Sequence, residues 1–309
     1  MENNIEVLAV CISEKKGTEK KEVEKIVLKE DWGIEGDAHA GKWHRQVSLL
    51  AFEKIDAFRK KGAEVDFGAF GENIIVGGVD LRSLPVGTVL EIGEAKLKVT
   101  QIGKECHSHC NIYKKMGDCI MPREGIFAEV LKGGVVQKGE SIKVIEKEEG
   151  PYRVGIVTVS DRASKGEYED KSGPMIKELV EAAGMEVIDY VIVPDEKSQI
   201  AKKLLYFSDQ RQADLVFTTG GTGFSKRDVT PEATKQVVER EVPGIGEALR
   251  AYSLTITPKA MLSRQTAGIR GNTLIINLPG SPKACKENID YIMTPLKHGL
   301  GILSGRETN

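Results

Sequence analysis

Hydrophobic residues in the first half of the chain fall into short β-branched runs that glycines separate. We expect strands at residues 23–28, 46–50, 73–76, 89–92, 95–102 and 141–145. Runs of this length and composition are typical of strands, and the intervening glycines supply turns. One helix, at about residues 51–61, is expected as an insertion. The pattern predicts a β-rich barrel or sandwich over residues 1–147.

The pattern changes after the charged stretch EKEEGP at residues 146–151, which we interpret as a linker. From residue 152 onward, apolar runs alternate with segments of helical periodicity. We expect strands at residues 152–159, 186–193, 213–219 and 273–278, and helices at 171–183, 196–207 and 282–303. Strands that are apolar along their whole length are typical of a parallel sheet covered by helices on both faces. Residues 152–309 are therefore predicted to form a three-layer α/β domain with a mostly parallel sheet.

Composition narrows the possible partners and the compartment. The 309 residues include 44 Lys and Arg against 46 Asp and Glu, a formal net charge of −2, which favours neither nucleic acid nor an anionic membrane as a partner. The first residues carry acids where a signal peptide needs positive charge, so a cytoplasmic protein is expected. Five cysteines, an odd number, indicate free thiols rather than a disulfide framework, and Cys285 falls on the core face of the last helix.

Candidate chemistry in the second half begins with TTGGTGFSKRDVTPEAT at residues 218–234. Ligands of open α/β sheets bind beyond the carboxyl ends of the strands, where this loop follows its strand. Glycine amides in such a loop can converge on phosphate, and Thr230 before Pro231 suits a helix N-cap. The loop lacks the lysine of a Walker A motif. The candidate phosphate-binding residues here are Thr219, Gly220, Gly221, Thr222, Gly223 and Thr230.

Other strands of this half also end in polar residues or glycines that could contact a phosphate or a metal ion. They are Ser160 and Asp161 after the first strand, Asp195 after the second, and Pro279, Gly280 and Ser281 after the last. Together with Asp228, the two aspartates could share a magnesium ion, which binds through one or two carboxylates plus substrate phosphates. Each aspartate taken singly could instead cap a helix.

The glycine motif, together with SRQTAGIRGNTLIINLPGSPKA at residues 263–284, resembles the molybdopterin adenylyltransferase family, whose domain recurs in gephyrin. The resemblance implies a homotrimer that binds molybdopterin and ATP and forms adenylylated molybdopterin with magnesium, without pyridoxal phosphate. Asp195 and Asp228 match the family's catalytic carboxylates and are expected to bind the magnesium ion. Arg270 or Ser281 would hold the pterin or its phosphate.

The first half contains GDAHAGKWHRQVSLL, GAFGEN and VTQIGKEC, which together resemble the MOSC domain over about residues 5–145. That resemblance implies a β-barrel with a reactive cysteine for cofactor or sulfur handling. Spacing favours Cys106, but GKEC stands where family members often have Arg-Ser-Pro-Cys, so Cys110 and Cys119 stay candidates beside His39 and Arg45. A zinc site, or surface histidines beside buried thiols, are the other interpretations of this cluster.

Taken together, these features predict an enzyme of molybdenum cofactor biosynthesis. Molybdenum insertion proteins or molybdoenzymes are candidate downstream partners. The alternative is a carrier that binds molybdopterin without adenylylating it, or a trimeric scaffold that presents MOSC domains.

Overall fold

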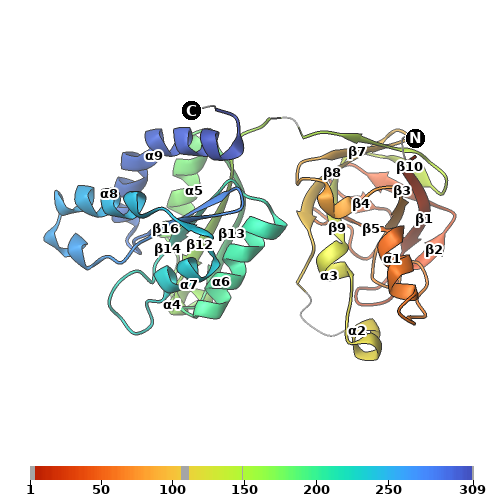
Figure 1. Ribbon diagram of the computed structural model, residues 1–309, viewed down its shortest axis with the longest axis horizontal. Coiled ribbons are helices and arrows are strands. Elements are labelled where there is room, and N and C mark those ends of the chain that lie inside the picture. The colour runs from red at the N-terminus through yellow and green to blue at the C-terminus, as the bar shows by residue number, and fades with distance from the viewer. Residues whose placement is uncertain (1–3, 106–110, 148, 308–309) are drawn as a thin grey trace. The chain divides into compact units, whose positions relative to one another are not determined.

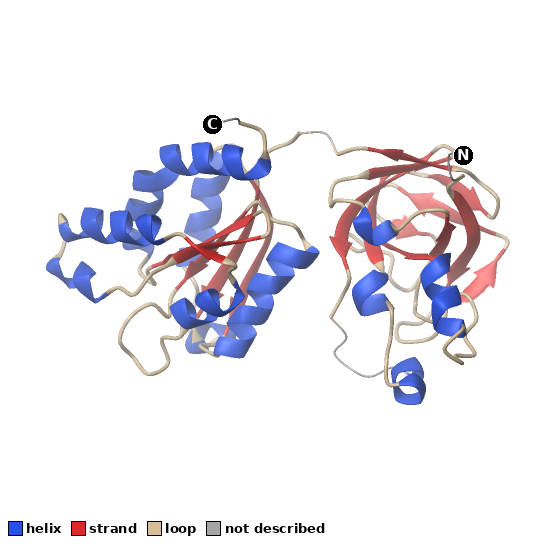
Figure 2. Cartoon of the chain, viewed as in Figure 1, coloured by secondary structure: helices blue, strands red, loops and turns tan. Residues whose placement is uncertain are grey.

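Strands dominate the first part of the chain and alternate with helices in the second (Figure 2). The computed structural model describes residues 4–105, 111–147 and 149–307. Contacts within the chain divide it into two units, Met1–Glu149 and Gly150–Asn309 (Figure 1). Each unit has its own buried cores.

The N-terminal unit is β-rich, as its hydrophobic pattern predicts. Its larger sheet has eight strands in the order β11-β7-β8-β9-β5-β6-β1-β2, and a smaller sheet has the order β10-β3-β4. The strands are β1 (Glu6–Ile12), β2 (Lys21–Val23), β3 (Lys25–Lys29), β4 (Gly33–Ile34), β5 (Val47–Ala51), β6 (Ile74–Gly77), β7 (Val89–Ile92), β8 (Ala95–Ile102), β9 (Ile126–Lys132), β10 (Gly134–Gln137) and β11 (Ile142–Ile145).

Backbone hydrogen bonds also join the start of β11 to β1. The Ile142 amide donates to the Ile5 carbonyl (2.8 Å), and the Val7 amide donates to the Glu140 carbonyl (2.9 Å). Strand β11 stands at one end of the order of the larger sheet, and β1 lies next to the other end. These bonds therefore link the strand at one end of the sheet order with the strand next to the other end.

Helices of this unit cover a second core outside the main one. They are α1 (Phe52–Arg59), η1 (Leu81–Ser83), α2 (Asn111–Met116) and α3 (Met121–Glu124). Ile55 and Phe58 of α1 are buried with Met121 of α3 in one apolar cluster. The pattern predicts α1 to within two residues but neither of the short helices α2 and α3.

Strand β9 was not predicted, although it is central to the larger sheet. Its sequence, IFAEVLK, contains Ala, Glu, Leu and Lys, which favour helices. The segment pairs antiparallel with both β5 and β8, and Ile126 and Ala128 are fully buried. Strand preference depends on packing against neighbours, so pairing on both sides overrides the local preference.

The C-terminal unit contains one six-stranded sheet in the order β13-β12-β14-β17-β16-β15. The first four strands are parallel, and β16 and β15 are antiparallel to their neighbours. The strands are β12 (Arg153–Val159), β13 (Glu186–Val193), β14 (Leu215–Thr219), β15 (Arg240–Glu241), β16 (Ala267–Arg270) and β17 (Thr273–Leu278). The predicted α/β domain with a mostly parallel sheet is confirmed.

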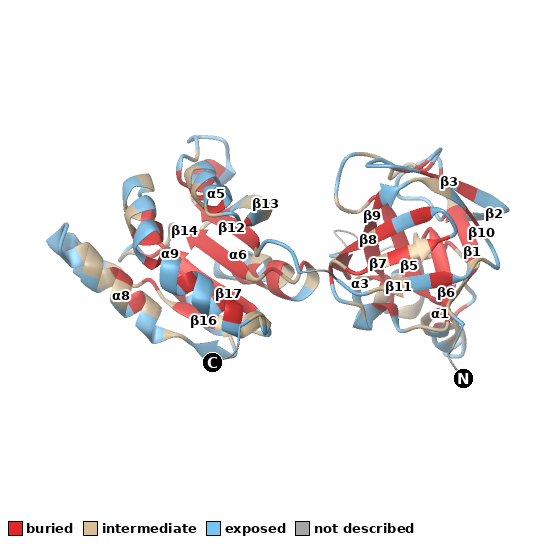
Figure 3. Cartoon of the chain, turned by 90° about the horizontal axis from the view of Figure 1, so that it is seen from above, coloured by how far each residue is buried: buried red, intermediate tan, exposed pale blue. Residues whose placement is uncertain are grey.

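Helices pack on both faces of this sheet, and Figure 3 shows β12 and β14 buried between them. One core cluster joins the sheet to α5 (Ser172–Ala182), α8 (Pro243–Leu254) and α9 (Pro282–Ser304). The opposite cluster joins it to α6 (Lys197–Leu205) and α7 (Thr230–Val237). Shorter helices are α4 (Asp161–Ser164), the π-helical turn η2 (Tyr206–Gln210) and η3 (Pro258–Leu262). The layers leave the carboxyl ends of β12, β13, β14 and β17 at one edge of the sheet.

Candidate functional site

The loop after β14 contains two glycines that no other residue could replace without strain. Gly220 and Gly221 have φ of +96° and +63°, in the left-handed region that favours glycine. A Cβ at Gly220 would strike the Val159 carbonyl at the end of β12. A Cβ at Gly221 would clash with Thr230 Oγ1 and lie 3.2 Å from Asp195 Oδ1. The loop therefore passes directly against the ends of two neighbouring elements and the Asp195 carboxyl.

Helix α7 starts against this glycine loop. The Thr230 hydroxyl donates to the Gly220 carbonyl (2.9 Å), and the Thr230 amide donates to the Gly221 carbonyl (3.1 Å). The helix begins at Thr230, with Val229 before it, and no side chain caps its first turn. Thr230 is thus not the side-chain N-cap that the sequence predicts, because its hydroxyl binds the glycine loop instead. The contact fixes the start of α7 relative to Gly220 and Gly221.

Arg264 joins the two ends of the segment that connects the glycine loop to α7. Its Nε donates to the Gly223 carbonyl (2.7 Å), and its Nη2 donates to the Asp228 carbonyl (2.5 Å). Its backbone amide donates to the carbonyl of the buried Thr222 (2.9 Å), and its Nη1 pairs with Glu232. The family motif at residues 263–284 includes Arg264, but the sequence does not show that it contacts the glycine loop.

The predicted residues after β12 and β13 come together. The Asp161 amide donates to Asp195 Oδ2 (2.7 Å), and the Asp195 amide donates to Asp161 Oδ1 (3.1 Å). This reciprocal pair ties the start of α4 to the end of β13. Ser160 caps α4 by accepting from the Ala163 amide (3.2 Å), so the capping role belongs to Ser160 rather than to Asp161.

Electrostatics at this edge are dominated by carboxylates. Burial raises the pKa of Asp195, and the neighbouring negative charges of Asp161 and Asp228 raise it further. The pKa of Asp161 is lowered, because Arg227 forms hydrogen bonds with that carboxyl. Asp195 is therefore the carboxylate of this group whose ionised form is disfavoured.

Asp228 and Asp195 both face the glycine loop. A Cβ at Gly223 would lie 2.9 Å from Asp228 Oδ2, which also accepts from the Ser225 amide (2.8 Å). Across residues 4–105, 111–147 and 149–307, however, no group of three His, Cys, Asp or Glu side chains is arranged to hold a metal ion. Asp161, Asp195 and Asp228 therefore do not form the shared magnesium site that the sequence suggested.

The loop after β17 packs against the glycine loop. Thr219 Oγ1 donates to the Pro279 carbonyl (2.7 Å), and a Cβ at Gly280 would lie 3.4 Å from the Gly220 Cα. The Ser172 hydroxyl at the start of α5 donates to the Gly280 carbonyl (3.0 Å). Ser281 directly precedes α9. All three predicted residues of this loop therefore lie at the same edge as Thr219.

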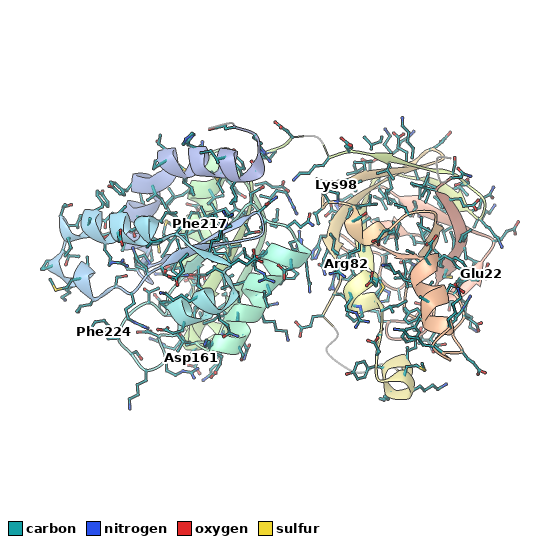
Figure 4. The ribbon with its side chains drawn as sticks, in the orientation of Figure 1. Glu22, Arg82, Lys98, Asp161, Phe217 and Phe224 are labelled. Carbon is teal, nitrogen blue, oxygen red and sulfur yellow. The ribbon has the colours of Figure 1, made fainter. Side chains whose placement is uncertain are left out.

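Figure 4 shows how this edge lies in the unit. Phe217 of β14 is within the sheet, whereas Asp161 and Phe224 lie toward the foot of the view, beyond the strand. Phe224 belongs to the segment between the glycine loop and α7, and its side chain is 70% exposed. The carboxyl edge of the sheet is therefore bordered by an exposed loop.

Arg270 is not brought to this edge. It pairs in register with Thr273, the first residue of β17, and so lies at the amino ends of the parallel strands. Its guanidinium forms a bidentate pair with Asp209 (2.7 and 2.8 Å) and donates to the Val237 carbonyl (3.0 Å). Because β16 runs antiparallel to β17, the end of β16 faces away from the glycine loop.

In the N-terminal unit, two of the predicted residues flank one tryptophan. The Trp43 indole donates to the His39 carbonyl (2.9 Å), and the Arg45 guanidinium lies 4.8 Å from the centre of the Trp43 ring. Cys119 is buried in the apolar cluster beneath α1. Cys106 and Cys110 lie outside the described residues.

Behind His39 is a buried ionic network that the sequence did not predict. Lys20 pairs with Asp37, and both side chains are almost fully buried. Asp37 also accepts from the His39 amide (2.9 Å) and from Asn73 Nδ2 (3.2 Å). Burial alone would raise the pKa of Asp37, but the hydrogen bonds from His39 and Lys20 outweigh it and hold that pKa below its usual range. Asp37 and Asn73 belong to the motifs that resemble the MOSC domain, whereas Lys20 lies outside them. The pairing of Lys20 with Asp37 is therefore visible only in the fold.

One further feature is relevant to localisation. Among the described helices, none has the length and apolar character needed to cross a membrane.

Two family models match the chain, one in each unit. The MOSC domain model matches residues 36–143, and a model described as a probable molybdopterin binding domain matches residues 155–298. The division into a first half with MOSC motifs and a second half with the glycine motif agrees with these matches.

Curated relatives match the C-terminal half. The molybdopterin adenylyltransferase of Helicobacter pylori strain J99 is 46% identical over 154 residues, which cover 49% of this chain and 88% of that protein. The molybdopterin adenylyltransferase of Escherichia coli K12 is 46% identical over 142 residues, 45% of this chain and 73% of that protein. Gephyrin of Dictyostelium discoideum is 42% identical over 170 residues, 52% of this chain and 24% of gephyrin. The chain thus belongs, through its C-terminal unit, to the molybdopterin adenylyltransferase family, and it carries an N-terminal MOSC domain.

Proposed function

We propose that this protein is an enzyme of molybdenum cofactor biosynthesis that adenylylates molybdopterin with ATP. The observation that carries the proposal is the carboxyl edge of the sheet, where Asp195 and Asp228 both face the loop at Gly221 and Gly223. The 46% identity to molybdopterin adenylyltransferases supports the same activity.

The reaction requires positioning and charge compensation rather than covalent catalysis. A terminal phosphate oxygen of molybdopterin attacks the α-phosphorus of ATP, and the bond from that phosphorus to the bridging oxygen breaks. Pyrophosphate leaves with the bridging oxygen and its electron pair. Amides of the glycine loop, from Gly220 to Gly223, and the start of α7 would hold phosphate oxygens. Thr219, Thr222 and Thr230 hold the loop in place, and Ser160, Asp161, Pro279, Gly280 and Ser281 border the substrate site.

Magnesium suits the residues at this edge. Asp195 and Asp228 offer hard oxygen donors, and magnesium is usually held by one or two carboxylates together with substrate phosphates. Burial and the repulsion from Asp161 and Asp228 both raise the pKa of Asp195, and the repulsion between these carboxylates also favours a bound cation. When bound, the ion would neutralise charge on the phosphates.

The N-terminal unit would bind the cofactor or carry sulfur. We propose that the larger sheet closes as a barrel through the hydrogen bonds between β11 and β1. Cys106, Cys110 and Cys119 are the candidate thiols, with His39 and Arg45 beside them. The domain limits that we propose are residues 1–147 and 152–309.

Assembly and location complete the proposal. The C-terminal unit would form a homotrimer in the cytoplasm, and molybdenum insertion proteins or molybdoenzymes would receive the product. The homotrimer is what the sequence resemblance to the family implies.

Titration with ATP and molybdopterin, followed by pyrophosphate detection, tests the proposal. An enzyme binds both ligands and releases pyrophosphate only when both are present. Binding of molybdopterin without pyrophosphate release would indicate a carrier. Absence of binding to either ligand would indicate a scaffold and would overturn the proposed function.

A further inference from the structure

Arg227, at the exposed end of the segment between the glycine loop and α7, contacts two carboxylates. Its Nε and Nη2 donate to the two oxygens of Asp161 (3.0 and 2.8 Å). Its Nη1 donates to Glu196 Oε1 (2.6 Å). The residue therefore bridges the start of α4 and the start of α6 from a third element, and the proposed reaction gives it no role.

This bridge lies next to the catalytic carboxylates. Asp161 accepts from the Asp195 amide and donates its own amide to the Asp195 carboxyl, while Asp228 follows Arg227 directly in the chain. Asp161 thus contacts both the guanidinium and Asp195. The guanidinium therefore lies at the edge of the sheet where the nucleotide phosphates would bind. A polyphosphate in this position would lie among the carboxylates Asp161, Asp195, Glu196 and Asp228 and would need a cation beside it.

The present partners of Arg227 are easily given up. The side chains of Arg227, Asp161 and Glu196 are 49%, 33% and 48% exposed. Ion pairs this exposed contribute little to stability, because water and salt compensate each charge once they separate. Arginine binds phosphate through two parallel hydrogen bonds in the same way as it binds a carboxylate. Exchange of one anion for the other therefore conserves the geometry of the guanidinium.

The segment that carries Arg227 is also free of core packing. Phe224 is 70% exposed, and Ser225, Lys226 and Arg227 are all exposed. Arg264 holds the two ends of this segment, at Gly223 and Asp228, and it also contacts Thr222 and Glu232, which lie outside these four residues. A shift of the segment would disturb few buried contacts.

We propose that Arg227 exchanges Asp161 and Glu196 for a phosphate of the bound nucleoside triphosphate, which makes it a substrate-binding residue of the nucleotide site. The proposal rests on the proposed function, because it requires ATP to bind at the glycine loop. In the free protein the two carboxylates hold the guanidinium at the edge of the site and compete with the nucleotide for it.

Two single variants should change ATP affinity in opposite directions. Arg227→Gln removes the phosphate partner and should weaken ATP binding about tenfold. Glu196→Gln removes a competing charge and should tighten ATP binding severalfold. Calorimetric titration of the full chain with ATP, with and without magnesium chloride, measures both. The double variant should bind like Arg227→Gln alone, since the effect of Glu196 acts through the arginine.

A matched pair at the opposite edge supplies the control. Arg270 and Asp209 form the same bidentate contact away from the glycine loop, so Arg270→Gln and Asp209→Asn should leave the ATP dissociation constant within about twofold. A purely structural bridge predicts that Arg227→Gln and Glu196→Gln weaken ATP binding alike and lower the unfolding temperature, which would overturn the exchange. Equal tightening by Glu196→Gln in the Arg227→Gln background would also overturn it. Wild-type protein that fails to bind ATP would refute the proposed function itself.

Discussion

The Asp195 carboxyl is placed where its charge is unfavourable for folding. It is partly buried, its pKa is raised by burial and by the charges of Asp161 and Asp228, and it faces the glycine loop. Charged groups that a fold tolerates at some cost in stability are typical of functional sites. The cost would be relieved when a cation or a cationic side chain approaches.

Replacing this carboxyl should therefore stabilise the free protein. Because the pKa of Asp195 is higher in the folded than in the unfolded chain, ionisation on raising the pH costs stability, and protonation at low pH removes the cost. Asp195→Asn should raise the unfolding temperature at pH 7 while lowering adenylylation. The gain should shrink as the pH falls through the raised pKa. Thermal unfolding of both proteins across this range measures it, and a variant less stable than wild type at pH 7 would contradict the interpretation.

Gly221 provides a second test at the residue scale. In Gly221→Ala the new methyl group would clash with Thr230 Oγ1 and approach Asp195, in addition to the strain of a positive φ. We expect at least about tenfold weaker ATP binding, roughly 1.4 kcal/mol. Gly184→Ala is the control, because Gly184 also has a positive φ of +78° but no atom within 4 Å of the added Cβ. Strain alone, roughly 1–2 kcal/mol of stability, should affect both variants. Equal ATP affinity in the two would show that contact at Gly221 is unimportant.

At the scale of elements, the loop before β6 depends on a buried carboxyl. Glu72 is fully buried, and its two oxygens accept from the Gly68 and Phe70 amides (2.8 and 3.0 Å). Burial raises the pKa of Glu72 to about 7, against an opposing effect of these amides and Lys20. The folded N-terminal unit should thus bind a proton at Glu72 that the unfolded chain has already lost at mildly acidic pH.

This difference predicts a pH dependence with a definite sign. The raised pKa of Glu72 contributes on the order of 3 kcal/mol to the free energy of unfolding. This contribution is fully present below the pKa that Glu72 has in the unfolded chain, and it is lost as the pH rises through about 7. The unfolding transition of the N-terminal unit should occur at a lower temperature at pH 8 than at pH 5. Glu72→Gln should remove this difference, which separates Glu72 from other groups that titrate in the same range. The same pH dependence in both proteins would contradict the role of Glu72.

The elements also show what could be predicted from the sequence. The bounds of β7, β8, β13 and β17 agree with the expected ones, because runs rich in apolar and β-branched residues between turn residues define them. Strand β9 was missed because its residues favour a helix and its pairing partners are distant in sequence.

The candidate site also contains residues whose positions the sequence predicts and residues whose positions it does not. The glycine loop and the aspartates follow their strands directly, so local sequence and a known rule for α/β sheets predict where they lie. Arg264 and Arg227 contact residues 31 to 66 positions away, and no local pattern shows such contacts. Arg270 illustrates the converse, since the antiparallel direction of β16 was not predicted and carries that residue to the other edge.

At the scale of the whole molecule, each unit buries a thiol in its core. Cys11 and Cys285 are fully buried, one in each unit, and burial raises the pKa of each to about 12. Cys285 Sγ also donates to the Pro279 carbonyl (2.8 Å), next to the glycine loop. These two thiols should be poor nucleophiles at neutral pH.

Alkylation should therefore distinguish a reactive cysteine of the MOSC domain from these two. We expect Cys106, between Lys104 and His107 in the sequence, to react with iodoacetamide faster than Cys11 and Cys285, and bound molybdenum cofactor to protect it. Peptide mass spectrometry after timed labelling, with and without cofactor, measures both effects. Fast, protected labelling of Cys110 or Cys119 would move the site to that residue. Labelling that the cofactor does not slow at any of the three would contradict a thiol ligand in this domain.

The central claim is that the C-terminal unit transfers an adenylyl group to molybdopterin at the edge where Asp195 and Asp228 face the glycine loop. Incubation of the full chain with molybdopterin and ATP labelled at the α-phosphorus tests it most directly. We predict that the label appears on molybdopterin with one pyrophosphate per transfer, and that Asp228→Asn, whose amide oxygen can still accept from Ser225, slows transfer at least about tenfold, ~1.4 kcal/mol in barrier. Asp209→Asn, at the opposite edge, should transfer at the wild-type rate. Bound ATP and molybdopterin without transfer of label, or an unchanged rate in Asp228→Asn, would contradict the account.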